Sequence, residues 1–143
     1  MTEKILAIAK EIEPRLIQIR RDIHSHPELG LQEERTAKLV ADTLEELGLE
    51  VKRNFFATGV VGLLKGGKPG KTLLIRADMD ALPVQEENDL PYRSTCDGKM
   101  HACGHDAHTT WLLGTAMILS RLKEDLCGNV KFMFQPAEEA PGG

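Results

Sequence analysis

One strand–helix–strand pattern constrains the fold of this chain more than any other feature of its sequence. The stretches KTLLIRAD (residues 71–78) and GNVKFMFQP (residues 128–136) are short and rich in Val, Ile, Leu and Phe, which predicts strands. Residues 106–122 predict a helix that begins with Asp106 as N-cap and has one apolar face, formed by Leu112, Leu113, Ala116 and Leu119. If both strands lie parallel in one sheet, this helix is their crossover and is long enough for a right-handed connection.

The remaining periodic segments extend this unit. Apolar residues at helical spacing predict helices over residues 3–23 and 33–47, and Pro14 is expected to kink or restart the first of them. Residues 49–56 and 59–67 have the composition of strands. The order helix, helix, strands, helix, strand predicts an α/β layer domain.

Composition and charge narrow the class of protein. The 143 residues, 41% hydrophobic and 28% charged, suffice for one domain with a core. A net charge of −4 argues against a nucleic-acid partner, and no apolar run is long enough to cross a membrane. The N-terminus lacks the apolar region of a signal peptide, and the odd cysteine count suggests free thiols. We therefore expect a cytoplasmic protein.

Polar residues gather at one edge of the predicted sheet. Ligands bind beyond the carboxyl ends of the strands in open α/β sheets. The segments RADMD (76–80) and QPAEE (135–139) each follow a strand, and HACGHD (101–106) leads into the crossover helix. We expect these segments to place six polar side chains in one cleft, namely Asp78, Asp80, Cys103, His105, Glu138 and Glu139.

The types of these side chains favour a metal site. Cys103 and His105 lie two positions apart, which places them on the same side if the segment is extended. Thiolate, imidazole and carboxylate ligands suit zinc and are also used by manganese, cobalt or nickel. Of two consecutive glutamates, one can bind metal while the other acts as general base on a bound water.

Alternatives remain open at each position. Glu138 and Glu139 are also consistent with a solvated acidic loop, and Asp78 and Asp80 with turn capping before a proline. Cys103 could instead be a nucleophile paired with a histidine. That reading leaves the clustered carboxylates without a role, whereas the metal site uses all of them.

Four motifs make the sequence resemble a known family. HPELGLQEERTAKLV, LLIRADMDALPVQE, MHACGHDAHT and FMFQPAEEAPGG, in this order, are similar to motifs of the metal-dependent amidohydrolases of the aminoacylase, hippurate hydrolase and indole-acetyl-amino-acid hydrolase type, some of which are called thermostable carboxypeptidases. The group belongs to the zinc exopeptidase superfamily. The resemblance implies a three-layer α/β catalytic domain with a mixed sheet.

The resemblance also implies roles for individual residues. Cys103, His105 and Glu139 match ligands of a site for two divalent metals (Zn, Mn, Co or Ni), with Cys103 in the bridging place, and Glu138 matches the general base. Asp78 lies where the wider superfamily often has a liganding histidine. Asp78 and Asp80 are therefore expected to orient the metal ligands through contacts with them. We expect neither to bind metal directly.

The implied activity is hydrolysis of the amide bond of an N-acyl amino acid. Alternatives are a carboxypeptidase acting on short peptides, an N-acetyl-diaminopimelate deacetylase or, from another class, a non-catalytic metal-binding or interaction module. Family members are longer, so residues 1–143 are expected to be the N-terminal part of the metal-binding catalytic domain, without the lid or dimerisation domain and the C-terminal catalytic part. We expect this chain to be inactive alone and the full-length parent to be a homo-oligomer.

Overall fold

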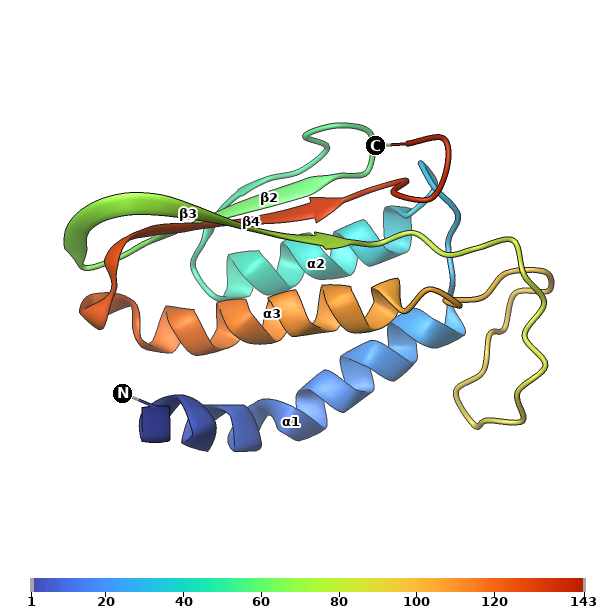
Figure 1. The fold of residues 1–143 in the computed structure, drawn as a ribbon, viewed down its shortest axis with the longest axis horizontal. Helices are drawn as coiled ribbons and strands as arrows, with labels where there is room; N and C mark the ends of the chain where they lie inside the picture. Colours follow the sequence, from blue (N-terminus) through green and yellow to red (C-terminus); the bar gives the residue numbers. More distant parts are fainter. Residues whose placement is uncertain (1, 143) are drawn as a thin grey trace.

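The structure, a computed structural model, describes residues 2–142 as one mixed sheet with helices against it (Figure 1). The elements in chain order are the helices α1 (Thr2–Ser25) and α2 (Glu34–Glu46), the strands β1 (Glu50–Lys52), β2 (Val60–Lys65) and β3 (Lys68–Asp78), the helix α3 (His105–Arg121), the short 3-10 helix η1 (Lys123–Asp125) and the strand β4 (Cys127–Gln135).

The sheet confirms the predicted strand–helix–strand unit. Its strand order is β1-β2-β4-β3, and β4 pairs in parallel with β3 and antiparallel with β2. Helix α3 connects the two parallel strands, and β3 and β4 end side by side at Asp78 and Gln135. Because both strands run in the same direction, the segments that follow them leave from one edge of the sheet.

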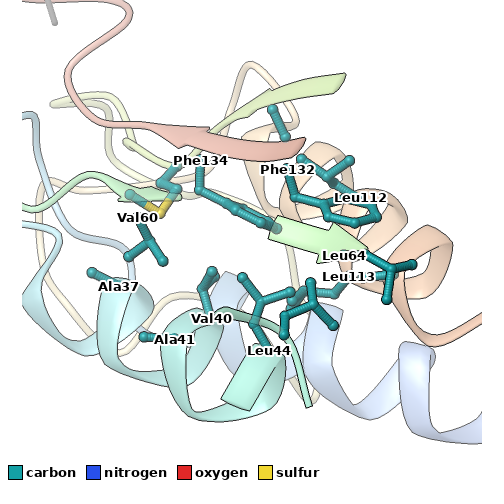
Figure 2. Packing of buried hydrophobic residues seen from close by; sticks show 14 of the residues in the cluster. Ala37, Val40, Ala41, Leu44, Val60, Leu64, Leu112, Leu113, Phe132 and Phe134 are labelled. Atoms are coloured by element: carbon teal, nitrogen blue, oxygen red, sulfur yellow. The ribbon is translucent and has the colours of Figure 1, made fainter. Parts of the chain in front are cut away.

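The hydrophobic core lies between the sheet and the two helices beneath it. Side chains alternate along β4, so that Val130, Phe132 and Phe134 point into the core while the residues between them point away. Figure 2 shows these aromatic rings among side chains of α2 and α3, including Val40, Leu44, Leu112 and Leu113. The apolar faces predicted for both helices are therefore confirmed.

The layers follow from this packing. Helices α2 and α3 lie against the same face of the sheet, and α1 packs on α3, on the side away from the sheet (Figure 1). The mixed sheet expected from the resemblance is confirmed, and within residues 2–142 helices cover one of its faces. Among these residues, no helix has the length and apolar character of a bilayer span.

Three local predictions differ from the structure in whole or in part. Of the two outcomes expected at Pro14, a restart of the helix does not occur: α1 continues through Pro14 to Ser25, and its packing along α3 holds the helical conformation on both sides of the proline. The strand predicted for residues 49–56 is confined to Glu50–Lys52, because Asn54 (φ 51°) and Ala57 (φ 44°) turn the chain back.

The third error concerns the start of α3. Gly104, with φ 88°, precedes the helix, which begins at His105, so that Asp106 lies in the first turn and is not the N-cap. The carboxylate of Asp106 is buried instead, where it forms an ion pair with Arg20 Nε at 2.8 Å and a hydrogen bond with His24 Nδ1 at 2.7 Å. These contacts tie the start of α3 to the end of α1.

Candidate metal centre

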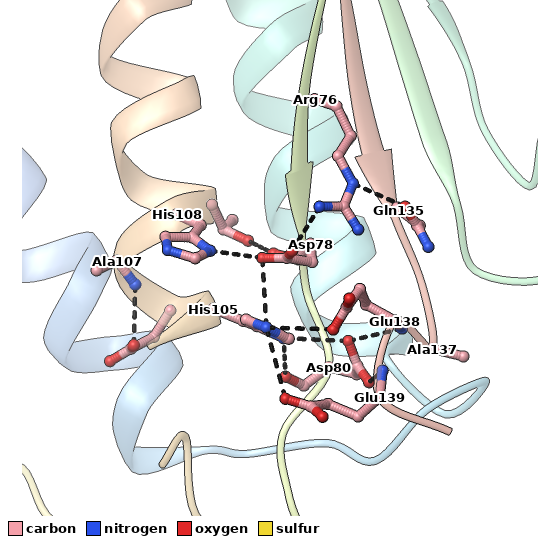
Figure 3. Close-up of polar contacts among 12 residues, drawn as sticks. Arg76, Asp78, Asp80, His105, Ala107, His108, Gln135, Ala137, Glu138 and Glu139 are labelled. Carbon is pink, nitrogen blue, oxygen red and sulfur yellow. Dashed lines mark hydrogen bonds and ion pairs between the residues drawn. The ribbon is translucent and has the colours of Figure 1, made fainter. Parts of the chain in front are cut away.

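The three polar segments meet as predicted, beyond the ends of β3 and β4 and at the first turn of α3. Figure 3 shows Asp78 at the end of β3, Asp80 on the segment that follows it, His105 at the start of α3, and the pair Glu138 and Glu139 on the loop after β4. The parallel pairing of β3 with β4 brings the two acidic segments together, and the crossover helix brings its first turn to the same edge.

Cys103, His105 and Glu139 form a group that could hold a cation. One ligand atom from each, a thiol sulfur, an imidazole nitrogen and a carboxylate oxygen, lie within 4.8 Å of one another. Cys103 and Glu139 are exposed and His105 is buried. The chain between Cys103 and His105 is not extended as the spacing argument assumed; the left-handed conformation of Gly104 turns it, and both side chains still reach the same place.

His105 is oriented by hydrogen bonds at one of its two ring nitrogens. Nδ1 lies 2.9 Å from the backbone oxygen of Asp80 and 3.2 Å from its carboxylate oxygen Oδ1. Two acceptors at Nδ1 place the ring proton there and leave the lone pair of Nε2 available, which is the arrangement of a metal-binding histidine. Nε2 faces Glu138 Oε2 and Glu139 Oε1, each 3.8 Å away.

Asp80 joins His105 to the glutamate pair. Its carboxylate is 1% exposed and accepts the backbone N–H of Glu138 at Oδ1 and that of Glu139 at Oδ2, both at 3.0 Å. One buried carboxylate thus orients the imidazole and both residues of the acidic pair. This geometry is consistent with the predicted supporting role of Asp80.

Asp78 has different partners. Its carboxylate lies 2.7 Å from His108 Nδ1, 2.9 Å from Arg76 Nη1 and 3.6 Å from His105 Nε2. Burial alone would raise the pKa of Asp78, but the hydrogen bond with His108 and the charges of His105 and Arg76 lower it overall. Asp78 is therefore a carboxylate whose charge is already balanced by its neighbours.

A second group of ligand types, Asp78, His105 and His108, also lies within 4.8 Å and shares His105 with the first. The sequence analysis did not select His108. Its position three residues after His105 in a predicted helix was the available signal, since such residues share a helix face. Arg76 on Asp78 makes this second group less suited to a cation than the first.

The thiol of Cys103 carries its proton in this arrangement. A hydrogen bond to Glu139 raises the pKa of Cys103 to about 11, and burial and the negative charges of Glu139, Glu138 and Asp78 act in the same direction. The same negative charges would attract a cation, which would displace the thiol proton. The donor set and the surrounding charge therefore fit a divalent metal of the zinc type.

Two further buried groups lie near the site, and the sequence analysis did not predict their partners. His24 Nε2 lies 3.2 Å from Glu86 Oε1, which extends the Asp106–His24 contact behind the first turn of α3. Glu33 is completely buried and accepts the backbone N–H of Ala137, next to the acidic pair. No local periodicity marks such residues, because their partners lie far away in the sequence.

Comparison with known proteins agrees with the family that the four sequence motifs resemble. Residues 74–143 match the peptidase family M20/M25/M40. Thermostable carboxypeptidase 1 of Saccharolobus solfataricus is 51% identical over 143 residues, which cover 99% of this chain and 36% of that protein. The N-acyl-L-amino acid amidohydrolase of Geobacillus stearothermophilus is 50% identical over 99% of this chain and 38% of its own length.

The fold is also found in solved structures. A Bacillus subtilis protein described as a dinuclear metal binding peptidase from the M20 family has a TM-score of 0.87 and 50% sequence identity, over 91% of this chain and 37% of that chain. The chain therefore spans little more than a third of the length of these relatives.

Proposed function

The chain contains part of a peptidase domain of the M20/M25/M40 family, and on this premise we propose that residues 1–143 are the N-terminal, metal-binding part of the catalytic domain of an amidohydrolase. The substrate would be an N-acyl amino acid, whose amide bond is hydrolysed to a carboxylic acid and a free amino acid. The observation that carries this proposal is the convergence of Cys103, His105 and Glu139 beside a second glutamate, Glu138.

Each residue has a role in this proposal. Cys103, His105 and Glu139 hold divalent metal, two ions in the complete enzyme, and the remaining ligands come from outside these residues. When bound, the metals polarise the substrate carbonyl and make water more acidic. Glu138, whose side chain is 39% exposed, takes the proton from water and delivers it to the leaving amine. Asp80 supports the ligands through its hydrogen bonds to His105 and to the backbone of Glu138 and Glu139. Asp78, which is held by His108, lies 3.6 Å from His105 Nε2.

A carboxypeptidase is the second candidate, because a relative of equal similarity bears that name. Both reactions hydrolyse an amide bond next to a free carboxylate, so the same ligands and the same base serve either substrate. Assays of hippurate, acetylated amino acids and dipeptides with one enzyme sample would distinguish the two.

The test uses a hybrid enzyme in which residues 1–143 replace the matching part of the Geobacillus stearothermophilus amidohydrolase. Glu138→Gln should lower kcat by about 100-fold or more, because a general base is lost. Metal content should not change, because Glu138 is not a ligand in this proposal. Glu87→Gln, at an exposed position outside the site, is the matched control. Near-normal turnover by the Glu138→Gln hybrid would exclude Glu138 as the base.

A further inference from the structure

The loop that carries Glu138 and Glu139 is held by two carboxylates from distant parts of the chain. Three consecutive backbone N–H groups donate to them: that of Ala137 to Glu33 Oε1 at 2.8 Å, and those of Glu138 and Glu139 to the Asp80 carboxylate at 3.0 Å each. Figure 3 shows Ala137 beside the acidic pair, with Asp80 between the pair and His105. Asp80 also contacts His105, whereas Glu33 has no place in the chemistry described so far.

Glu33 is an unusual residue in the core of a protein. Its side chain is 0% exposed, and its two hydrogen-bond donors are neutral groups, the Ala137 amide and the Thr58 hydroxyl, which lies 2.5 Å from Oε2. Burial of a carboxylate is costly unless hydrogen bonds compensate for the lost water. Glu33 therefore connects the loop after β4 to the loop before β2. An apolar residue at this buried position would carry a smaller desolvation cost.

The contact at Ala137 controls a strained part of the loop. Ala137 has φ 50°, a left-handed conformation that a residue with a Cβ atom adopts only when its surroundings impose it. This turn directs the chain from the end of β4 back toward His105. The hydrogen bond from Ala137 to Glu33 is formed at this turn, one residue before Glu138.

The segment that carries Glu33 touches the same loop at a second point. A Cβ atom on Gly30 would lie 2.1 Å from the backbone oxygen of Ala140 and 2.9 Å from the Cβ of Ala137. The loop therefore lies directly on the backbone of Gly30, and any side chain there would push it away. Gly30 and Glu33 together hold residues 137–140 in place.

We propose that Glu33 is a positioning residue for the site: its hydrogen bond to Ala137 fixes the loop so that Glu139 reaches Cys103 and Glu138 faces His105. Glu33 acts through the backbone and does not contact the ligands itself. The consequence for metal binding and for the base rests on the proposed function, whereas the control of the loop conformation does not.

The test compares three variants of the 143-residue chain: Glu33→Ala, Glu33→Gln and the control Glu34→Ala, at the exposed neighbouring position. Hydrogen exchange of the amides of residues 137–139, followed by NMR without metal, reports the loop. A titration with Co²⁺ reports the ligand group. The amides of Phe132 and Phe134 within β4 serve as the reference for global stability.

Glu33→Ala should accelerate exchange at residues 137–139 by about 10-fold or more relative to the β4 amides, because the loop opens locally. It should weaken Co²⁺ binding by about 10-fold, the size of effect seen when a group that orients a ligand is lost. Glu33→Gln should restore both values to within about threefold, since its amide oxygen still accepts from Ala137. Glu34→Ala should match the original chain.

Unchanged exchange and unchanged Co²⁺ affinity in Glu33→Ala would overturn the proposal. If the original chain binds no Co²⁺ but Glu33→Ala still accelerates exchange at residues 137–139, the positioning role stands and the metal assignment fails. If Glu33→Ala does not fold, Gly30→Ala decides the question: faster exchange at residues 137–139 with protected β4 amides supports the proposal that the segment of Gly30 and Glu33 holds this loop in place, and unchanged exchange overturns it.

Discussion

The two groups of possible metal ligands share His105 and differ in how their charge is balanced. In the group of Asp78, His105 and His108, the carboxylate already has Arg76 at 2.9 Å and His108 at 2.7 Å. In the group of Cys103, His105 and Glu139, the additional charges that face His105 Nε2 are those of Asp78 Oδ1 at 3.6 Å and Glu138 Oε2 at 3.8 Å, and both are negative. Equal proximity of ligand atoms therefore does not mean equal affinity for a cation.

The comparison leads to the central claim, that a cation binds to Cys103, His105 and Glu139. A cation there gains the attraction of two carboxylates and displaces one thiol proton. A cation beside Asp78 would meet the guanidinium of Arg76. The second group is better understood as a support, in which His108 and Arg76 hold Asp78 next to His105.

The largest effect is expected for the residue that both groups share. His105→Ala removes the only imidazole of the first group and should weaken Co²⁺ binding by the chain by about 100-fold or more, because too few ligands remain. Isothermal titration calorimetry measures this directly. Retention of more than a tenth of the original affinity would mean that the cation binds elsewhere.

The next effect separates the two groups. Cys103→Ser should weaken Co²⁺ binding by about 10- to 100-fold, whereas His108→Ala should change it by less than about threefold, since in our account His108 supports Asp78 and is not a ligand. The same calorimetric experiment applies to both variants. The reverse order of affinities would assign the cation to the group of Asp78, His105 and His108.

The smallest effect concerns the reactivity of the Cys103 thiol. Its pKa of about 11 means that, without metal, little thiolate is present at pH 8 and alkylation becomes faster as the pH rises toward 11. At pH 8 Cys103 holds on the order of 100-fold less thiolate than a free model thiol, and because a thiolate of higher pKa is more nucleophilic, its alkylation should be about 10-fold slower, although its side chain is exposed. Saturating Co²⁺ should remove the pH dependence, because the metal takes the place of the proton and shields the sulfur.

Mass spectrometry of each cysteine after timed alkylation measures both effects on Cys103, with the exposed Cys127 as an internal reference. Equal labelling of Cys103 with and without Co²⁺ would exclude it as a ligand.

The sequence predicts which segments meet at the site, but it does not predict the hydrogen bonds and ion pairs that hold the site together. Alternating apolar residues around Phe132 and helical spacing around Leu113 are local signals, and they suffice to place the ends of β3, β4 and α3 at one edge. The partners of buried polar groups are not local. Glu33 and Ala137 are 104 positions apart, and nothing near either residue indicates the other.

The start of α3 is a second place where local sequence does not predict the contacts of a polar residue. Asp is one of the residue types preferred at helix N-caps, and this preference alone assigns that role to Asp106. Its contacts with Arg20 and His24, which belong to a helix more than 80 positions earlier, draw the carboxylate into the protein instead. Tertiary contacts thus decide the role of a residue whose type alone suggests another.

A titration of the 143-residue chain with Co²⁺, followed by absorption spectroscopy, tests the central claim most directly. A cobalt ion bound to a thiolate gives a sulfur-to-metal charge-transfer band in the near ultraviolet, and here Cys103 is the only cysteine in the predicted ligand group. We predict a band that saturates at about one equivalent of Co²⁺, as expected for three protein ligands with water completing the site. Binding of Co²⁺ without this band, or a band that persists in Cys103→Ser, would contradict the account.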